Sequence, residues 1–307
     1  NGVYCYDAQR RSTHYRHRQN DWNSLCSNTI IDVAEDKRGH LWFASSRSGV
    51  SIFDPSNSIF TNLKHSDRDV HSLGSDKITS IICDAKGFVW IATDGGGLSR
   101  INANETKPKR FDVYTVQDGL PSDIVLNIMD DASGNIWIAS ALALSVLNPS
   151  TNSISSFTDR DGLRDDYKAY RFIKGFNGKM FIGSFAGYYE FNPATVLPKE
   201  TKYNLVVNSF KVFDKDRTFL DEIEQNGAIN LMPDENFFSF EFAALNLTAP
   251  EKFKYAYKLE GFDKEWIYCG TRRYASYTNL PGGEYVFKVK AAYGGCATCE
   301  NWEGQEL

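Results

Sequence analysis

The sequence contains no long apolar run. No stretch approaches the 18 residues that a membrane-spanning helix requires, and no signal-peptide pattern opens the chain. Methionine is scarce, with 3 residues against 21 phenylalanines and 16 tyrosines, a composition that favours strands over helical bundles. Charge of neither sign dominates, and the formal net charge of -5 argues against bulk nucleic-acid binding. With 307 residues, 42% of them hydrophobic and 24% charged, we expect about two globular domains.

Sequence motifs of catalytic and metal sites are also missing. The chain has no H-E-x-x-H, G-x-S-x-G or P-loop pattern, and residues 95–97, Gly-Gly-Gly, lack the lysine and the helix of a phosphate cradle, which favours a turn. The five histidines show no metal-ligand spacing. Cys296 and Cys299 form a C-x-x-C pair. A structural zinc site would need two further ligands nearby, so the sequence favours either a local disulfide or two free thiols, and does not distinguish between them. We therefore expect neither a metal nor a cofactor.

A repeat dominates the first two thirds of the chain. In four segments a glycine is followed three residues later by an aromatic residue: Gly39 by Trp42, Gly87 by Trp90, Gly134 by Trp137 and Gly178 by Phe181. The aromatic positions are 48, 47 and 44 residues apart, which is the length of one four-stranded propeller blade. The segment around each tryptophan is apolar on both faces, as expected of a strand that neighbouring blades cover on each side.

Flanking patterns extend this repeat to a whole blade. A short β-rich run precedes each segment, and an Asp followed three residues later by Gly, as at Asp84 and Gly87, is typical of a type I turn. A third strand follows, as at residues 97–102. Residues 2–7 match that third strand, so we expect the chain to begin inside a repeat, as an N-terminally truncated piece of a longer propeller. Residues 1–203 are thus predicted to form about four and a half blades.

Residues 204–307 follow a different pattern. Phe238, Phe240 and Phe242 alternate with Ser239 and Glu241, and the same alternation recurs over residues 254–260 and 285–291. Short alternating strands over about 100 residues predict an immunoglobulin-like β-sandwich, in which Tyr285, just after a Pro-Gly turn, has the place of a tyrosine corner. Residues 1–203 contain equal numbers of basic and acidic residues, so the whole negative balance belongs to this second domain.

These residues resemble a known family. The repeat is similar to the two-component regulator propeller, whose pattern runs D-x-x-G-x-[LIV]-W-[IF]-[AG]-[ST]-x-x-G-[VL], and the C-terminal segment resembles the Tyr-rich (Y_Y_Y) sandwich that follows this propeller. The second match is carried by Tyr255, Tyr257, Gly261, Trp266, Tyr277, Leu280, Pro281, Gly282 and Tyr285. The resemblance implies the periplasmic sensor region of a hybrid two-component histidine kinase, anchored in the inner membrane of a Gram-negative bacterium. It also implies an oligosaccharide ligand, a homodimer formed near the membrane, and a kinase region outside this non-enzymatic fragment.

Breaks in the repeat suggest where a ligand would bind. Propellers bind on the face made by the loops that lead into the innermost strands and the loops that join the second and third strands. Asn28, Asp76 and Asp123 recur in the first set, which indicates a structural role such as an Asx-turn. Six positions depart from the repeat and offer aromatic, Arg and Asp side chains that suit a sugar; they are Arg47, Asp94, Phe185, Tyr167, Tyr170 and Arg171. Ordinary loop positions, or contacts to further blades, are the alternative interpretation.

Two other functions stay open from the sequence. Paired carboxylates, such as residues 130–131 and 165–166, would suit a glycosidase or a lyase, although Asp131 is also the turn residue of its repeat. A protein-binding scaffold is the second alternative. The basic stretch 10–18 could contact nucleic acid or an acidic sugar, but its place in the repeat is that of an outermost, solvated strand.

Overall fold

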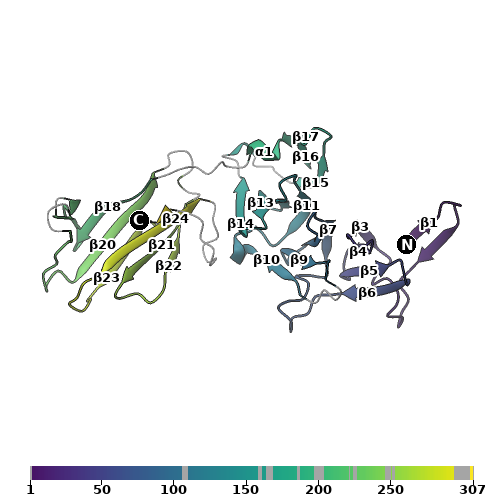
Figure 1. The fold of residues 1–307 in the computed structure, drawn as a ribbon, viewed down its shortest axis with the longest axis horizontal. Helices are drawn as coiled ribbons and strands as arrows, with labels where there is room; N and C mark the ends of the chain where they lie inside the picture. The colour runs from purple at the N-terminus through teal and green to yellow at the C-terminus, as the bar shows by residue number, and fades with distance from the viewer. Residues whose placement is uncertain are drawn as a thin grey trace. The chain divides into compact units, whose positions relative to one another are not determined.

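The computed structural model is built almost entirely of β-strands and divides into two units, residues 1–197 and 198–307, which we describe separately (Figure 1). The structure describes residues 2–105, 110–157, 161–163, 169–184, 187–196, 204–220, 222–223, 227–245, 250, 253–293 and 305–306. Cys296 and Cys299 lie outside these residues. No helix in this part of the chain is long and apolar enough to cross a membrane. The predicted all-β fold is confirmed.

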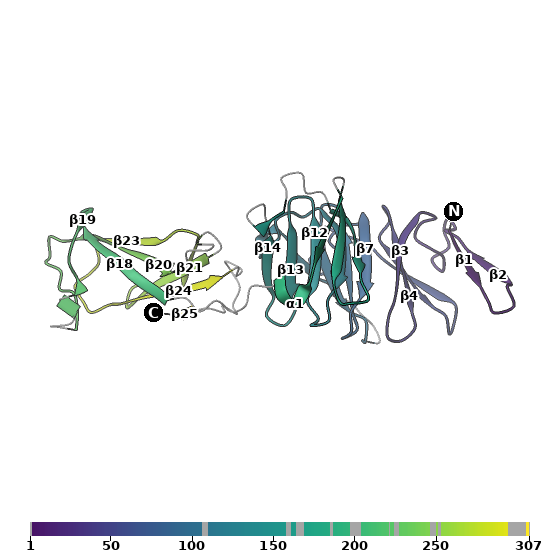
Figure 2. The ribbon, with the colours of Figure 1, turned by 90° about the horizontal axis from the view of Figure 1, so that it is seen from above.

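Five antiparallel sheets follow one another along the first unit, and we number them as blades I to V (Figures 1 and 2). Within each sheet the strands pair in chain order. Their bounds are β1 (Val3–Tyr6) and β2 (Ser12–Tyr15) in blade I; β3 (Ile30–Glu35), β4 (Leu41–Ser45), β5 (Val50–Asp54) and β6 (Ile59–Leu63) in blade II; β7 (Ile78–Cys83), β8 (Phe88–Thr93), β9 (Leu98–Asn102) and β10 (Asp112–Tyr114) in blade III; β11 (Val125–Asp130), β12 (Ile136–Ser140), β13 (Leu144–Asn148) and β14 (Ser153–Phe157) in blade IV; β15 (Ala169–Lys174), β16 (Met180–Ser184) and β17 (Gly187–Phe191) in blade V. A 3-10 turn (Val116–Asp118) and a short helix α1 (Pro193–Val196) complete the unit.

The core of this unit lies between consecutive blades. The tryptophans of β4, β8 and β12 have no exposed surface, because each packs on the blade that follows. The pairs that share an apolar cluster are Trp42 with Ile81 of blade III, Trp90 with Ile128 of blade IV, and Trp137 with Phe172 of blade V. Burying such large side chains supplies most of the stabilisation between blades. The apolar character of the tryptophan strand therefore follows from stacked blades, as the sequence predicts.

The innermost strands β3, β7, β11 and β15 lie side by side, each in contact with the next. Each has a one-residue shift in its pairing with the second strand of its blade, at residues 31, 79, 126 and 170. A bulge of this kind bends the strand and redirects the residue that follows it. The same irregularity in four blades places residues 32, 80, 127 and 171 in equivalent positions.

The second unit is a sandwich of two antiparallel sheets. One contains β18 (Asn204–Val212), β19 (Lys215–Asp216), β20 (Phe237–Leu245) and β23 (Tyr274–Thr278), and the other contains β21 (Phe253–Glu260), β22 (Ile267–Gly270), β24 (Val286–Tyr293) and β25 (Gln305–Glu306). Side chains of both sheets form one core, in which the rings of Phe240 and Phe287 stack at 4.1 Å. The Tyr285 hydroxyl donates to the Pro281 carbonyl oxygen at 2.8 Å, which confirms the predicted tyrosine corner.

Candidate functional site

A buried carboxylate organises the turn between the first two strands of blades II, III and IV. Asp36 Oδ2 accepts a hydrogen bond from the Trp42 indole nitrogen at 3.0 Å, while Oδ1 accepts the backbone N–H groups of Arg38 and His40. One side chain thereby satisfies donors that the turn and the buried ring would leave unpaired. The Gly39 N–H donates to Asp36 O at 2.9 Å, as the predicted type I turn requires. The same carboxylate–indole bond joins Asp84 to Trp90 at 2.8 Å and Asp131 to Trp137 at 3.0 Å.

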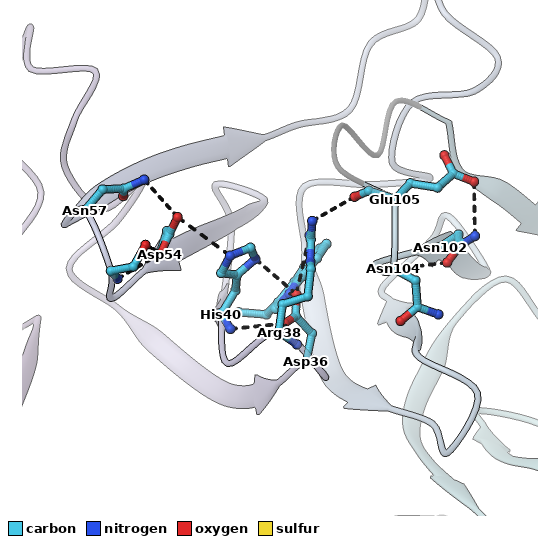
Figure 3. Close-up of polar contacts among 10 residues, drawn as sticks. Asp36, Arg38, His40, Asp54, Asn57, Asn102, Asn104 and Glu105 are labelled. Atoms are coloured by element: carbon cyan, nitrogen blue, oxygen red, sulfur yellow. Dashed lines mark hydrogen bonds and ion pairs between the residues drawn. The ribbon is translucent and has the colours of Figure 1, made fainter.

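In blade II this turn belongs to a longer polar chain, which Figure 3 shows in close-up. The His40 ring lies with Nδ1 3.3 Å from Asp36 Oδ2 and with Nε2 3.7 Å from Asp54 Oδ2. Arg38 donates to the Glu105 carbonyl oxygen, which follows β9 of blade III, at 2.9 Å. Within blade II the side chains of this cluster contact one another, and Arg38 extends the cluster to blade III. We therefore assign the cluster the role of joining two blades.

The loops at the other end of the strands bond each blade to the next. The Gly49 N–H, at the start of β5, donates to the Asp76 carbonyl oxygen in the loop that leads into blade III, at 3.0 Å. Gly2 and Gly97 make the equivalent bonds to Asn28 and Asp123 at 2.8 and 2.9 Å. All three glycines have positive φ, and a Cβ on any of them would collide with a carbonyl oxygen of the last strand of the same blade. Only glycine therefore fits these junctions.

The glycine-rich segment after Asp94 belongs to the same set of junctions. The Gly95 and Gly97 N–H groups both donate to the Asp123 carbonyl oxygen, at 3.1 and 2.9 Å. These amides are occupied within the fold and do not point at a free anion site. The interpretation of this segment as a turn is confirmed.

Two loops between blades, residues 16–29 and 64–77, have matching hydrogen bonds. The His17 N–H donates to Asn28 Oδ1 and the His65 N–H to Asp76 Oδ1, both at 2.8 Å. Nδ1 of each histidine lies 2.7 Å from the carbonyl oxygen of the leucine eight residues later. The predicted structural role of Asn28 and Asp76 is thus confirmed, but the form is different: each side chain closes a whole loop instead of a local Asx-turn.

The same loops also contact the outermost strand of the blade that they lead into. Asn23 Oδ1 accepts the N–H of Phe60, in β6 of blade II, at 2.7 Å. The His71 carbonyl oxygen accepts the N–H of Phe111, just before β10 of blade III, at 2.8 Å. Each loop therefore lies against the exposed edge of a sheet.

A chain of hydrogen bonds crosses the innermost strands from blade II to blade V. Asp32 Oδ2 accepts from the Ser80 hydroxyl and from the Ile81 N–H, both at 3.1 Å. Asn127 donates through Nδ2 to Ser80 Oγ at 3.1 Å and accepts the Phe172 N–H at Oδ1 at 2.8 Å. Asp32, Ser80 and Asn127 occupy the equivalent position after the bulge, so one position of the repeat joins four blades.

In blade V that position holds Arg171, which is exposed on β15. A guanidinium has donors only, so Arg171 cannot accept a backbone N–H as Asp32 and Asn127 do. The chain of hydrogen bonds therefore does not continue through the side chain of Arg171, where an exposed cation takes the place of an acceptor.

Those predicted ligand residues that the structure describes lie in three different blades. Arg47 is exposed between β4 and β5, and Asp94 is half-buried between β8 and β9, with its carboxylate 3.8 Å from Lys77 Nζ. Within the described part of the chain, no hydrogen bond or ion pair joins any two of Arg47, Asp94 and Arg171. Tyr170 lies on β15 in blade V, and Tyr167 and Phe185 are outside the described residues. These six positions stay a prediction.

The carboxylate pair in blade IV is committed to the fold. Asp131 is buried and accepts from the Trp137 indole and from the Ser133 and Asn135 N–H groups. Asp130 lies 3.8 Å from Lys174 Nζ. A glycosidase needs two carboxyl groups that face one cleft, an arrangement that this pair does not offer. The second pair, residues 165–166, lies outside the described residues.

Family models match both units. Residues 24–47 and 72–95 match the two component regulator propeller, and residues 246–296 match the Y_Y_Y domain. The chain therefore contains segments that are similar to both families, in this order along the sequence. Each matched repeat runs from the loop before an innermost strand, through the Asp–Trp turn, to the end of the tryptophan strand. The expected resemblance is thereby confirmed for both parts of the chain.

Individual relatives agree with the two family models. Histidine kinase P4 of Formosa agariphila is 24% identical over 163 residues, a match that spans 50% of this chain and 12% of the kinase. An extracellular domain assigned to a hybrid two-component system of Bacteroides thetaiotaomicron has a TM-score of 0.63 at 22% identity, over 99% of this chain and 40% of that one. A second such domain from that organism has a TM-score of 0.50 at 18% identity, over 92% of this chain and 49% of its own. The chain thus has the fold of these extracellular domains and spans less than half of each.

Proposed function

We propose that this chain is part of the periplasmic ligand-sensing region of a hybrid two-component histidine kinase. The observation that carries the proposal is a structural match that covers 99% of the chain, and so includes both units, with the extracellular domain of such a system. The propeller and Y_Y_Y matches and the kinase relative support the same assignment. In this proposal the chain binds and does not catalyse, and a membrane helix and a kinase belong to the remainder of the protein.

The ligand in this proposal is an oligosaccharide bound on the loop face of the blades. Residues 1–203 carry no net charge, which suits an uncharged sugar with many hydroxyl groups. The loops of that face are tied together by the glycine junctions, so they form a preorganised surface that loses little entropy on binding. Arg47, Asp94 and Arg171 contribute exposed or half-exposed hydrogen-bonding groups on blades II, III and V.

Signalling requires that the ligand bind two arrangements of the receptor with different affinity. We assign that coupling to the sandwich, which would pass the geometry of a homodimer to the membrane. A ligand without such a difference would occupy the propeller and leave the kinase unchanged.

Calorimetric titration of the complete ectodomain against defined neutral oligosaccharides tests the proposal. The expected result is saturable binding of one glycan series without its cleavage, and a change in autophosphorylation when the full-length kinase in lipid vesicles receives that glycan. Release of shorter products, followed by chromatography, would instead identify a carbohydrate-active enzyme. Binding by no glycan would overturn the oligosaccharide assignment.

A further inference from the structure

The Trp22 indole is 77% exposed, whereas Trp42, Trp90 and Trp137 of the same unit are fully buried. Trp22 lies in the loop of residues 16–29 that leads from blade I into blade II. Single apolar side chains are common on protein surfaces, so exposure alone identifies nothing. Two further observations bear on the exposure of Trp22: the hydrogen bonds that hold its loop, and the exposure of its counterpart in the next repeat.

The residues on both sides of Trp22 are held in place. Ser24 Oγ accepts the Arg18 N–H at 3.1 Å and donates to the Asp21 carbonyl oxygen at 2.7 Å. The Asn23 N–H donates to Asp21 Oδ1 at 3.0 Å, and Asn23 Oδ1 accepts the Phe60 N–H of β6 at 2.7 Å. The backbone that carries the indole is thus fixed before any ligand arrives, which lowers the entropy lost on binding.

Val70 is the counterpart of Trp22 and serves as an internal control. It occupies the same position in the loop of residues 64–77, where Ser72 and Asp69 make the hydrogen bonds of Ser24 and Asp21, and it is 84% exposed. That loop lies between blades II and III, which both have four strands. Exposure at this position is therefore a property of the loop, and the two-stranded blade I does not cause it.

The chemistry beside Trp22 suits a sugar ring. An indole face is a large apolar surface that packs well against the C–H groups of a pyranose, and its N–H leaves one polar group at the edge. The Arg18 guanidinium, 75% exposed and 3.9 Å from Asp21 Oδ2, has free surface from which it can donate to sugar hydroxyls, and the Asp21 carboxylate can accept from them.

The charges of this region favour a sugar over nucleic acid. Asp21 lies beside Arg18, and Asp7 binds Arg11 at 2.6 Å, so the basic stretch of residues 10–18 is partly neutralised. Phosphate groups require uncompensated cations, whereas sugar hydroxyls use donors and acceptors equally well.

We infer that Trp22 is the stacking platform for one pyranose ring of the oligosaccharide, with Arg18 and Asp21 bonding the hydroxyls of that ring. The inference rests on the proposed function and assigns a contact residue to it. Val70 offers no π face in the next loop, so the platform distinguishes one blade from its neighbour, as an asymmetric ligand requires.

The test compares the 307-residue chain with Trp22→Ala, Trp22→Phe and the matched control Val70→Ala. A glycan array of neutral oligosaccharides and a single-stranded oligothymidylate serve as probes, followed by calorimetry with the best binder. We expect Trp22→Ala to lose at least about tenfold in affinity at an unchanged melting temperature, Trp22→Phe to lose about threefold or less, and Val70→Ala to bind as the parent chain does. Acrylamide quenching of the difference fluorescence between the parent chain and Trp22→Phe should fall when the sugar binds, because the difference isolates the emission of Trp22, whose exposed ring the sugar would cover.

The failures are distinguishable. Equal affinity of the parent chain and Trp22→Ala for a bound oligosaccharide overturns the platform and leaves the proposed function standing. Binding of no oligosaccharide by the parent chain overturns the platform, and binding of none by the complete ectodomain overturns the oligosaccharide assignment as well. Protection of Trp22 by oligothymidylate and by no sugar replaces the inference with a nucleic-acid contact.

Discussion

The carboxylate of Asp84 accepts a 2.8 Å hydrogen bond from the indole nitrogen of Trp90, six residues further along the chain, and both side chains are buried. The other carboxylate oxygen accepts the N–H groups of Lys86 and Phe88 at 2.8 and 2.9 Å. One aspartate thus holds both the turn and the ring that fills the space between blades III and IV.

Replacing Asp84 with Ala should destabilise the propeller by about 2–4 kcal/mol, because the buried Trp90 indole N–H and two partly buried backbone N–H groups lose their acceptor. Chemical denaturation followed by circular dichroism measures the shift in midpoint. In a double-mutant cycle with Trp90→Phe the two losses should not add, since the phenylalanine ring has no N–H to satisfy. Full additivity would show that the hydrogen bond contributes nothing of its own.

Replacing Gly97 with Ala should cost more than replacing Gly134 with Ala. Both glycines have positive φ, of 67° and 82°, and an alanine at either pays about 1 kcal/mol for that conformation. A Cβ at Gly97 would also overlap the Tyr114 carbonyl oxygen, whereas a Cβ at Gly134 meets nothing within 4 Å. We expect a melting temperature several degrees lower for Gly97→Ala than for Gly134→Ala, measured by calorimetry. Equal losses would contradict the steric account of this junction.

Replacing Asn127 with Ala should speed the hydrogen exchange of one backbone amide in another blade, that of Phe172 in blade V. Asn127 is buried and accepts the Phe172 N–H at 2.8 Å, so its removal leaves that donor without its acceptor, at a cost of about 1–3 kcal/mol. Hydrogen exchange should show faster exchange at Phe172, with little change at amides of blade II. Asn127→Asp keeps the acceptor and should preserve more of the protection at Phe172. Unchanged exchange in the alanine variant would exclude the proposed chain of hydrogen bonds.

The loop of residues 64–77 should become less stable as the pH rises through the raised pKa of His65. The hydrogen bond to the Leu73 carbonyl oxygen raises the pKa of His65, and Asp67, 2.9 Å from Nε2, raises it further. A raised pKa in the folded state gives stability that is fully present below the unfolded pKa of about 6.5 and is lost as the pH rises through the folded value. An NMR titration should show the His65 pKa falling in Asp67→Asn but staying above that of a model peptide. A fall below the peptide value would contradict the assigned cause.

Much of the fold follows from the sequence because its determinants are local and recur. The spacing of Trp42, Trp90 and Trp137 predicts the blades, the Asp-to-Gly spacing predicts the turn, and Tyr285 after its Pro-Gly turn predicts the corner of the sandwich. Each depends on a residue type that physical chemistry demands at that position, so a single sequence reveals it.

The hydrogen bond between Asp36 and Trp42 could also have been predicted from the recurring residues of the repeat. Asp precedes Trp by six residues in three repeats, and in the fourth repeat Gly175 replaces the Asp where Phe181 replaces the Trp. The repeat that lacks the tryptophan, and therefore the indole N–H, also lacks the aspartate that would accept from it. This joint change is the signal that identifies the pair.

The chain of hydrogen bonds across the inner strands could not be predicted in this way. Asp32, Ser80 and Asn127 share a position but not a residue type, and their partners lie more than 40 residues away in the chain. The exposure of Trp22 was equally hidden, because it depends on how the loop of residues 16–29 is folded. Long-range polar contacts and loop conformations are set by tertiary structure, and alternation or spacing does not encode them.

The contacts from Asn23 to Phe60 and from the His71 carbonyl to Phe111 also bear on solubility. The outermost strand of a blade is a sheet edge, and a free row of N–H groups there would pair with the edge of another molecule. Each loop bonds one N–H at such an edge, that of Phe60 or of Phe111, and so removes one donor that an incoming strand would use to begin pairing. An edge covered in this way is a poorer template for edge-to-edge pairing, the first step of aggregation, than a bare edge would be.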